Sequence, residues 1–464
     1  MQSVIALFDI GKTNKKLFLI DEQYRIVLEK TEQFAETTDE DGEACEDLAK
    51  LTDWVLTSFD TVLNDKTYNI QAVNFSAYGA SFVHLNTEGV AITPLYNYLK
   101  PLSEVFKKQF YEDNGGEAAF TRLSASPVLG NLNSGMQLYR LKYEKLEAFN
   151  NIKHSIHLPQ YLSYLLTNQL FSDITSIGCH TNLWNFDKNE YADWVIKEGI
   201  LEKLAPIFPS DAVVEIAKDD EVQTSLSLKI GVGLHDSSAA LIPYLSSFTE
   251  PFLLISTGTW CISMNPFNNT PLTDFELEND CLCYMTFQGK PVKSARLFAG
   301  FEHEQQTQSI AKHFNLPLDF YKNIDFDAKI IDLLRGRNRE IIRGFVSATV
   351  RTASVFEQRD LNDLETVEVA YHQLILDLMA QQVMSTRLVL NDQTPVKRIF
   401  VDGGFSKNPI YMNLLASQFP EIEVFAASVA QATAIGAALA IHKHWNTQAV
   451  PSNLIDLKYY AHAE

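Results

Sequence analysis

Two stretches of the sequence, about half the chain apart, share one pattern, and this repeat constrains the fold most strongly. In residues 4–21 an apolar run leads into Asp9, a short polar turn follows, and a second apolar run leaves the turn. In residues 251–266 an apolar run leads into a turn around Gly258, and a second strand-like run follows it. Two apolar runs around a tight turn are typical of a β-hairpin. The repeat therefore predicts two similar halves, each beginning with a hairpin.

The composition of the first turn favours a phosphate site. Gly11 lets the backbone approach a ligand closely, and Thr13 and Asn14 offer short hydrogen-bonding side chains. The turn also contains three lysines, Lys12, Lys15 and Lys16. Such a turn suits phosphate oxygens, and Asp9 beside it is placed to hold Mg²⁺ through water. The alternative is an edge hairpin with a lysine-rich tip.

The charge balance argues against two classes of partner. The 464 residues include 38 Lys and Arg and 58 Asp and Glu, a formal net charge of −20. Nucleic acid and anionic membrane surfaces both need clustered cations, so neither is expected as a partner.

No apolar run approaches about 20 residues, the length that spans a membrane, and no basic segment marks a signal peptide. The five cysteines are dispersed and fit reduced thiols, so we expect a cytoplasmic protein.

Two strand-to-helix corners add candidate site residues. A glycine-bearing apolar run delivers His235 and Asp236 to the start of a small-residue helix, and side chains at such a corner point into clefts. The alternative is that Asp236 or Ser237 only caps that helix. A later apolar run ends in Gly403-Gly404 before another helix, which permits close approach of a flat or phosphate-bearing ligand.

The two hairpin turns and the two corners stand in one order along the chain. Together they resemble the FGGY carbohydrate kinase family, in particular its rhamnulokinase-like and L-fuculokinase-like members. The resemblance covers about the whole chain, from residue 4 to about residue 444. It implies an α/β fold class, with two ribonuclease-H-like domains of the actin/hexokinase/heat-shock-chaperone ATPase superfold and an interdomain cleft for nucleotide and sugar.

The resemblance also implies how the chain is divided. Residues 1–246 would form an N-terminal domain with the sugar site, the first phosphate loop and the catalytic aspartate. Residues 247–445 would form a C-terminal domain with the second phosphate loop and the adenosine site. Residues 446–464 would form a C-terminal extension.

The resemblance further implies a role for each candidate residue. Asp236 corresponds to the catalytic base, which accepts the proton of a sugar hydroxyl as the γ-phosphoryl group arrives. Asp9 corresponds to the residue that holds Mg²⁺ through water. The residues implied to bind ATP are Gly11, Lys12, Thr13, Asn14, Lys16, Thr257, Gly258, Thr259, Gly403, Gly404 and Asn408. Those implied to bind the substrate are Tyr78, Gly79, Tyr96, Asn97, Tyr98, His235 and Asp236.

The sequence departs from the family pattern in the predicted sugar loop. Relatives usually have Trp or Tyr, x, Asp, x, Arg there, whereas this chain has Tyr96-Asn97-Tyr98-Leu99-Lys100. Because Tyr98 replaces the carboxylate, the usual substrate is not implied. In the first turn, Lys12 stands where relatives usually have Thr, Ser or Ala, which predicts a partly ionic phosphate contact.

Together these features predict an ATP-dependent kinase that phosphorylates a ketose or deoxyketose similar to L-rhamnulose or L-fuculose, with ATP and Mg²⁺ as cofactors. The altered sugar loop leaves open a catalytically weak or inactive sugar- or nucleotide-binding sensor of the same superfold. A chaperone-type or actin-type ATPase also fits the superfold, but the sequence has no recognisable peptide-binding domain or filament-building insertion. The sequence leaves open which sugar and hydroxyl react, and whether the chain forms the homodimer that is common for such enzymes.

Overall fold

The computed structural model describes residues 1–217, 227–337 and 355–461, which form two compact units. Unit 1 comprises Met1–Ser247, Cys283–Pro291 and Ala430–Leu454. Unit 2 comprises Phe248–Leu282, Val292–Val429 and Ile455–Glu464. The first border lies next to the boundary expected after residue 246, but neither unit is continuous in sequence. Residues 462–464 of the expected C-terminal extension lie outside the described residues.

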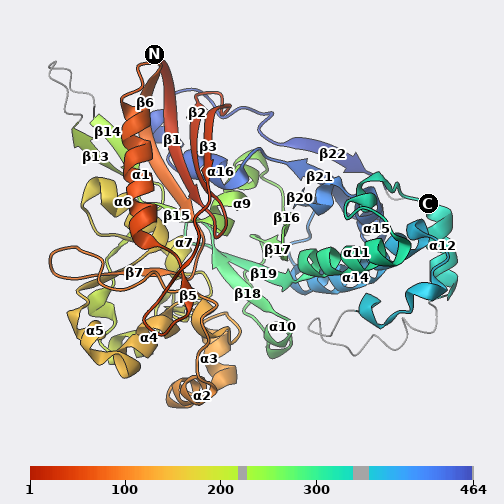
Figure 1. The fold of residues 1–464 in the computed structure, drawn as a ribbon, viewed down its shortest axis with the longest axis horizontal. Helices are drawn as coiled ribbons and strands as arrows, with labels where there is room; N and C mark the ends of the chain where they lie inside the picture. The colour runs from red at the N-terminus through yellow and green to blue at the C-terminus, as the bar shows by residue number, and fades with distance from the viewer. Residues whose placement is uncertain (218–226, 338–354, 462–464) are drawn as a thin grey trace. The chain divides into compact units, whose positions relative to one another are not determined.

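A mixed β-sheet forms the centre of unit 1 (Figure 1). Its strand order is β13-β14-β6-β1-β2-β3, and β15 also pairs with β6. The strands are β1 (Gln2–Ile10), β2 (Lys15–Asp21), β3 (Ile26–Glu32), β6 (Tyr68–Ala77), β13 (Val213–Ala217), β14 (Ser227–Gly231) and β15 (Leu234–His235). Because β1 pairs with β2 in antiparallel register, the predicted first hairpin is confirmed.

Helices and short strand pairs complete unit 1. The helices are α1 (Leu48–Leu63), α2 (Glu104–Asp113), α3 (Glu117–Leu123), α4 (Gly135–Glu144), α5 (Leu146–Asn151), α6 (Leu158–Thr167), α7 (Ile174–Ile177), α8 (Asp193–Lys197), α9 (Asp236–Ser247), α16 (Ala432–Ala440) and α17 (His442–Trp445). The short pairs are β4 (Thr37–Thr38) with β5 (Ala44–Cys45), β7 (Phe82–Leu85) with β8 (His154–His157), β9 (Ser172–Asp173) with β12 (Ile207–Phe208), and β10 (Trp184–Asn185) with β11 (Glu190–Tyr191).

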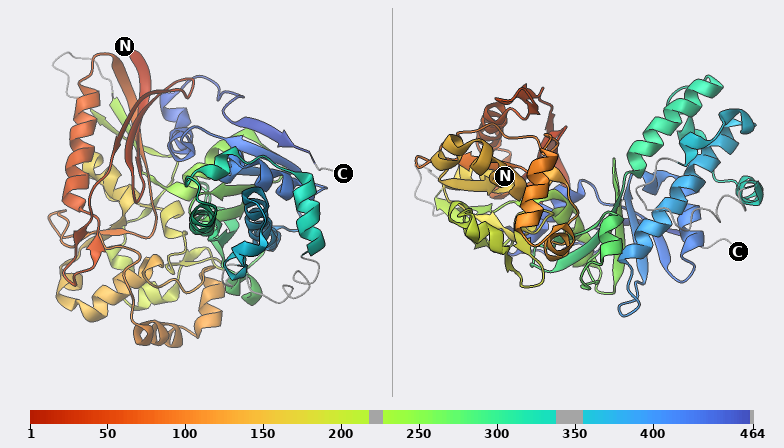
Figure 2. Two further views of the ribbon diagram at one scale, coloured as in Figure 1. Left: turned by 45° about the vertical axis from the view of Figure 1, so that its right-hand side comes forward. Right: turned by 90° about the horizontal axis from the view of Figure 1, so that it is seen from below.

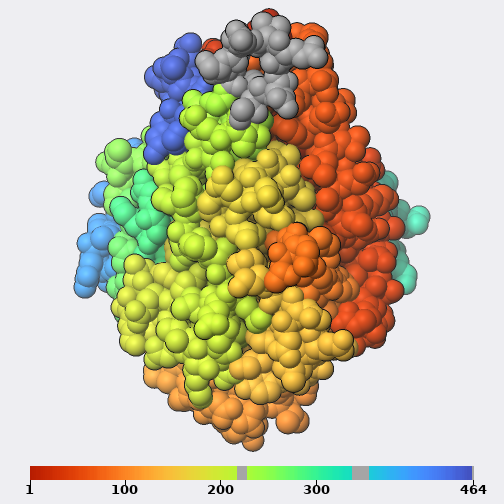
Figure 3. All heavy atoms as spheres, turned by 90° about the vertical axis from the view of Figure 1, so that its left-hand side faces the viewer, coloured from red at the N-terminus to blue at the C-terminus, as the bar shows by residue number. Residues whose placement is uncertain are grey.

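The side chains of β1 alternate between the two faces of the sheet, as strand geometry requires. Val4, Ala6, Phe8 and Ile10 are buried in one core with residues of α1 and α6. Figure 3 shows this face, where the red-orange and yellow segments lie side by side, and a 2.9 Å hydrogen bond joins Thr52 of α1 to Tyr161 of α6. Asp9, which alternates with these residues, instead points to the face covered by α16.

A second mixed sheet forms the centre of unit 2, with the strand order β18-β19-β17-β16-β20-β21-β22. Its strands are β16 (Phe252–Thr257), β17 (Cys261–Asn265), β18 (Cys281–Met285), β19 (Pro291–Leu297), β20 (Arg398–Gly403), β21 (Glu423–Ser428) and β22 (Asp456–Tyr460). Since β16 and β17 pair in antiparallel register, the predicted second hairpin is also confirmed.

Long helices cover the sheet of unit 2. The helices are α10 (Asp274–Glu278), α11 (Ala299–Phe314), α12 (Ala328–Arg337), α14 (Val367–Val389) and α15 (Pro409–Gln418). Figure 2 shows α11 and α14 as neighbouring helices, and His303 of α11 bonds the Tyr371 hydroxyl of α14 at 2.9 Å. Within the described ranges, no helix combines the length and the apolar character that a bilayer span requires.

Candidate functional site

Three parallel strands of unit 1 end side by side at predicted site residues. Asp9 of β1 lies opposite Ser76 of β6, and β15 pairs with the same stretch of β6. The chain leaves β6 towards Tyr78 and leaves β15 at His235 directly into α9, which begins at Asp236. Parallel strands direct their carboxyl ends to one edge of a sheet, where open α/β sheets bind ligands. The structure therefore brings these predicted residues to one edge.

The carboxylate of Asp236 is more basic than usual and is partly exposed to solvent. Its Oδ1 accepts a 2.6 Å hydrogen bond from the backbone N–H of Ser237. Burial raises the pKa of Asp236 to about 6, while 32% of its side chain stays exposed. At neutral pH the group is mostly ionised and is more basic than an ordinary aspartate, which suits general-base chemistry.

Asp9 is electrostatically coupled to Asp236. Burial raises the pKa of Asp9 to about 6, and the negative charge of Asp236 adds to this shift. A 2.7 Å hydrogen bond from the Thr433 hydroxyl and the positive charge of Lys16 act in the opposite direction. A cation bound near Asp9 would favour its ionised form.

His235 is neutral and packed against the base. Burial lowers the pKa of His235 to about 4, so the ring is uncharged at neutral pH. Its Nε2 lies 3.2 Å from Oδ1 of Asp236 and 3.3 Å from Sγ of Cys179, and the ring stacks on Tyr284. A Cβ at Gly79 would stand 2.7 Å from the imidazole. Glycine is therefore required at position 79 because a larger side chain would clash with the His235 ring. This requirement is independent of any contact between Gly79 and substrate.

Sequence analysis missed two buried residues that hold this corner. The hydroxyl of Thr175 accepts a 3.0 Å hydrogen bond from the backbone N–H of His235. Asp173 in turn accepts the N–H of Thr175 at 2.9 Å and the hydroxyls of Thr175 and Ser210. Both Asp173 and Thr175 are fully buried. Both residues lie in a short run rich in small and polar residues, 173–178, that carried no recognisable motif.

The three lysines of the first turn have different environments. Lys12 Nζ lies 2.7 Å from Glu36, and the buried Lys15 pairs with Glu46 at 2.5 Å. Lys16 is the lysine whose charge acts on Asp9. Whether Lys12 binds phosphate therefore stays a prediction, since a carboxylate already neutralises it.

The backbone of this turn is closed by one hydrogen bond. The N–H of Gly11 donates to the carbonyl of Asn14 at 2.9 Å. The Asn14 side chain accepts a 2.7 Å hydrogen bond from Gln33, whereas Thr13 is exposed. Of the side chains in the turn itself, Thr13 is the one that solvent, and hence a soluble ligand, reaches most easily.

The predicted sugar loop is largely held by protein contacts. Lys100 is buried and pairs with Asp39 and Asp41 at 2.5 and 2.7 Å. The Tyr96 hydroxyl donates to Glu40 at 2.6 Å, and Asn97 accepts the N–H of Leu99 at 3.0 Å. These contacts use the polar groups of Tyr96 and Lys100 within the protein.

Tyr98 is the member of this loop that lies near the base. The negative charge of Asp236 contributes, after burial, to the raised pKa of Tyr98. Its ring centroid is 6.1 Å from that of Tyr78, which is buried. Of the loop residues predicted to bind substrate, Tyr98 therefore has the best-supported position.

In unit 2, the predicted second phosphate loop and the Gly-Gly corner meet. The parallel strands β16 and β20 end together, with Thr257 opposite Gly403. The Thr257 hydroxyl donates to the carbonyl of Asp402 at 2.5 Å and accepts the N–H of Phe405 at 3.0 Å. A Cβ at Gly403, where φ is +94°, would stand 2.0 Å from the Thr257 carbonyl oxygen, so the close approach requires glycine.

The other glycines of this corner leave open space. A Cβ at Gly258 would meet its nearest atom only at 4.0 Å, and a Cβ at Gly404 only at 3.9 Å. Gly258, Thr259 and both corner glycines are exposed. Exposed backbone without side chains is what a phosphate or a flat ring needs for close contact.

Asn408 has a clear structural role. Its Oδ1 accepts the N–H groups of Ile410 and Tyr411, both at 3.0 Å, and so caps α15. Its Nδ2 donates to the Tyr371 hydroxyl at 2.7 Å. Because these hydrogen bonds engage the Asn408 side chain, a contact between Asn408 and adenosine stays a prediction.

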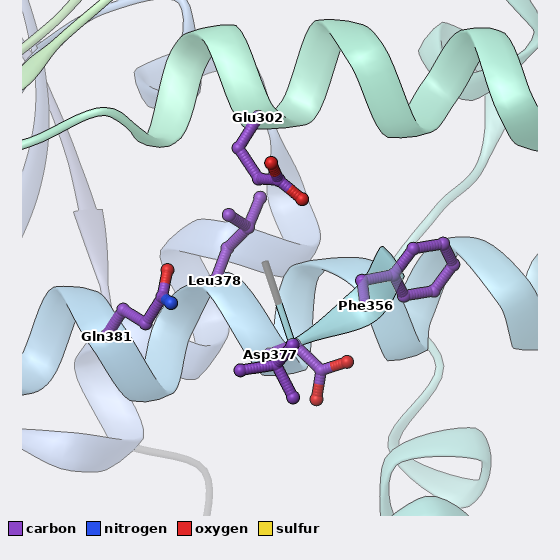
Figure 4. Close-up of a pocket in the computed structure, with 6 residues that line it drawn as sticks. Glu302, Phe356, Asp377, Leu378 and Gln381 are labelled. Carbon is purple, nitrogen blue, oxygen red and sulfur yellow. The ribbon is translucent and has the colours of Figure 1, made fainter. Parts of the chain in front are cut away.

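A small pocket elsewhere in unit 2 is unsuitable for the predicted ligands. Figure 4 shows it between α11 and α14, with Glu302, Phe356, Asp377, Leu378 and Gln381 around it. Its volume of about 10 Å³ has room for about one water molecule. It is therefore no candidate for a sugar or nucleotide site.

Comparison with family models identifies the chain. The model of the N-terminal domain of the FGGY family of carbohydrate kinases matches residues 4–242, more than half of the chain. The chain belongs to the FGGY family of carbohydrate kinases. Two models of the C-terminal FGGY domain match residues 249–331 and 365–442. The predicted family and the predicted class of enzyme, a carbohydrate kinase, are thus confirmed.

Similar proteins carry related names. A rhamnulokinase of Bacteroides thetaiotaomicron is 25% identical over 222 residues, 45% of this chain and 43% of that protein. A rhamnulokinase of Oceanobacillus iheyensis is 20% identical over 470 residues, 94% of this chain and 92% of that protein. A carbohydrate kinase from Novosphingobium aromaticivorans has a similar crystal structure, with a TM-score of 0.77 and 22% identity over 98% of this chain and 96% of that one. This likeness confirms the predicted fold class of two α/β domains.

FGGY kinases use ATP, generally with Mg²⁺, and unit 1 offers a fitting donor set. Mg²⁺ is usually bound by one or two carboxylates together with water and phosphate oxygens. Asp9 and Asp236 supply two carboxylates with raised pKa values. No cluster of three or more His, Cys, Asp or Glu ligands occurs in the described parts of the chain. The residues therefore fit a nucleotide-associated Mg²⁺ rather than a metal held by protein ligands alone.

Proposed function

We propose that the chain transfers the γ-phosphoryl group of ATP to a hydroxyl of a ketose or deoxyketose similar to L-rhamnulose or L-fuculose. The observation that carries the proposal is Asp236, an ionisable and partly exposed carboxylate at the end of β15, with a pKa raised to about 6. Two relatives named rhamnulokinase favour a ketose of this type.

In the proposed reaction, Asp236 removes the proton of the sugar hydroxyl. The hydroxyl oxygen forms a bond to the γ-phosphorus, and the bond from that phosphorus to the β–γ bridging oxygen breaks, which releases ADP. His235, being neutral, places no positive charge beside the carboxylate. The proposed ATP contacts are Gly11, Lys12, Thr13, Asn14, Lys16, Thr257, Gly258, Thr259, Gly403, Gly404 and Asn408. Mg²⁺, held beside Asp9 through water, would neutralise phosphate charge.

The deciding experiment is an ADP-release assay with Mg-ATP and a panel of L- and D-ketoses, deoxyketoses and polyols. Loss of a general base typically lowers the rate about 10²- to 10⁴-fold, so Asp236→Asn should abolish turnover of the sugar that the wild type accepts. Asp47→Asn is a matched control, because Asp47 caps α1 through the N–H of Lys50 and lies in no proposed site. Full activity of Asp236→Asn would reject the base assignment.

A second candidate function is a sensor that binds sugar or nucleotide without efficient catalysis. The observation that favours it is Lys100, which stands at the usual arginine position but is buried in ion pairs with Asp39 and Asp41. Failure of every sugar to stimulate ADP release, with Mg-ATP still bound in calorimetry, would favour this reading over the kinase.

A further inference from the structure

Glu46, which no sequence motif marked, joins two parts of the proposed site in unit 1. Its Oε1 lies 2.5 Å from Nζ of Lys15 in the first phosphate turn. Its Oε2 accepts a 3.2 Å hydrogen bond from the hydroxyl of Tyr78 on the sugar side. The exposed fractions of the Glu46 and Lys15 side chains are only 4% and 1%. This carboxylate therefore forms a buried bridge between the two.

Lys15, the ion-pair partner of Glu46, also holds the backbone of the turn. Lys15 Nζ also donates to the carbonyl of Lys12 at 3.0 Å. That carbonyl lies inside the turn that the hydrogen bond from Gly11 to Asn14 closes. The position of the ammonium group, and hence of the turn, depends on the carboxylate that neutralises it, because a buried charge without a partner is strongly unfavourable.

Tyr78, the hydrogen-bond partner of Glu46, lies on the side of the proposed base. The Tyr78 ring lies beside Tyr98, with 6.1 Å between the ring centroids. Tyr98 in turn is close enough to Asp236 for that charge to contribute to its raised pKa. One hydrogen bond therefore links the Tyr78 hydroxyl to Glu46, and one ion pair links Glu46 to the phosphate turn.

We propose that Glu46 is a positioning residue that couples the sugar side of unit 1 to the first phosphate turn. The proposal rests on the proposed kinase function and deepens it. Because Glu46 contacts both parts, a change made at Tyr78 should alter ATP binding, and a change made at Glu46 should alter the binding of both substrates. A residue that only stabilises the fold would change the melting temperature without changing the KM for ATP or the KM for the sugar.

The test uses the full chain with three variants, Glu46→Gln, Tyr78→Phe and the double variant. Each single variant should raise the KM for ATP about fivefold, the lower end of typical coupling between sites. Because both act through the same bridge, the double variant should show the effect of Glu46→Gln alone rather than the product of the two. If Glu46→Gln does not fold, Tyr78→Phe still decides the question, since it leaves the ion pair with Lys15 in place.

Glu198 supplies a matched control in the same unit. Its carboxylate also bonds one lysine, Lys142 at 2.7 Å, and one tyrosine hydroxyl, Tyr143 at 2.9 Å. Glu198→Gln should lower the melting temperature but leave both KM values unchanged. An unchanged ATP KM in Tyr78→Phe and Glu46→Gln, or an equal rise in Glu198→Gln, would overturn the proposal.

Calorimetry with Mg-ATP separates this proposal from the proposed function. If the wild type phosphorylates no sugar of the panel, the kinase proposal fails, while the dissociation constant of Mg-ATP still tests the bridge. Weaker Mg-ATP binding in Tyr78→Phe, with Glu198→Gln unchanged, would support the coupling role. Equal affinity in wild type, Glu46→Gln and Tyr78→Phe would reject it.

Discussion

The hydroxyl of Thr433 donates a 2.7 Å hydrogen bond to the carboxylate of Asp9, although 424 residues separate them in sequence. Thr433 belongs to α16, which packs so closely on α9 that a Cβ at Gly436 would stand 1.8 Å from the carbonyl oxygen of Ala239. The small residues of α16 are what permit this contact. A segment near the end of the chain thus adjusts a carboxylate near its beginning.

Replacement of Thr433 should change the pH dependence of Mg-ATP binding. The pKa of Asp9 is already raised to about 6, and the Thr433 hydrogen bond is one of the factors that lower it. Thr433→Val removes that bond, so the pKa should rise further and Mg-ATP binding should weaken at a higher pH than in the wild type. Thr433→Ser keeps the hydroxyl and should retain the wild-type profile. Coincident profiles for all three proteins would show that Thr433 does not influence Asp9.

The free energy of unfolding should also reveal the raised pKa of Asp236. Its pKa is 3.8 in the reference state and about 6 in the folded protein. The folded protein therefore binds the proton more tightly, and this group makes stability fall as pH rises from about 3.8 to about 6. Asp236→Asn removes the ionised carboxylate, so it should raise the melting temperature at neutral pH and lose that advantage in acid. Thermal melts across this range measure the effect.

A control separates this result from a capping role. If Asp236 served only as a helix cap, Asp236→Asn would leave stability nearly unchanged, because Asn caps about as well as Asp. Asp47→Asn, at the cap of α1, should show that small change at every pH. A melting temperature of Asp236→Asn that tracks the wild type across the range would contradict the raised pKa.

The parts of the fold and site that sequence predicted are those encoded by local pattern. Apolar runs around Gly11 and Gly258 predicted both hairpins, and strand-to-helix corners predicted the positions of Asp236 and Gly403. Each of these signals lies within one short segment. Strand periodicity and glycine placement are enough to read them.

The parts that sequence did not predict depend on partners far apart in the chain. Three lysines in one turn suggested a positively charged phosphate site, but Glu36 and Glu46 neutralise Lys12 and Lys15. Both carboxylates lie outside the turn, at positions that no sequence motif marked. Which charge remains for a ligand is decided by tertiary packing, which one sequence pattern does not contain.

Thr175 should support the rate rather than substrate binding. Its hydroxyl accepts the backbone N–H of His235 at 3.0 Å, one residue before the proposed base. Thr175→Val keeps the shape but leaves that buried N–H without its acceptor. A misplaced catalytic group can cost about 10²-fold, so kcat should fall by up to that factor with little change in the KM for ATP. Thr175→Ser restores the hydroxyl and should recover most of the rate. A Thr175→Val variant with wild-type kcat would show that this bond does not position Asp236.

Gly258 tests the second phosphate loop in unit 2. A Cβ at this position would meet its nearest atom only at 4.0 Å, so Gly258→Val places a side chain in open, exposed space without an internal clash. If that space receives a phosphate of ATP, the side chain should weaken Mg-ATP binding at least about tenfold, which corresponds to about 1.4 kcal/mol. Gly336→Val is the matched control, because a Cβ at Gly336, which belongs to α12, would meet no atom within 4 Å. Calorimetry with Mg-ATP and Mg-ADP measures both variants at one ionic strength. Unchanged affinity in Gly258→Val, or an equal loss in Gly336→Val, would remove Gly258 from the nucleotide site.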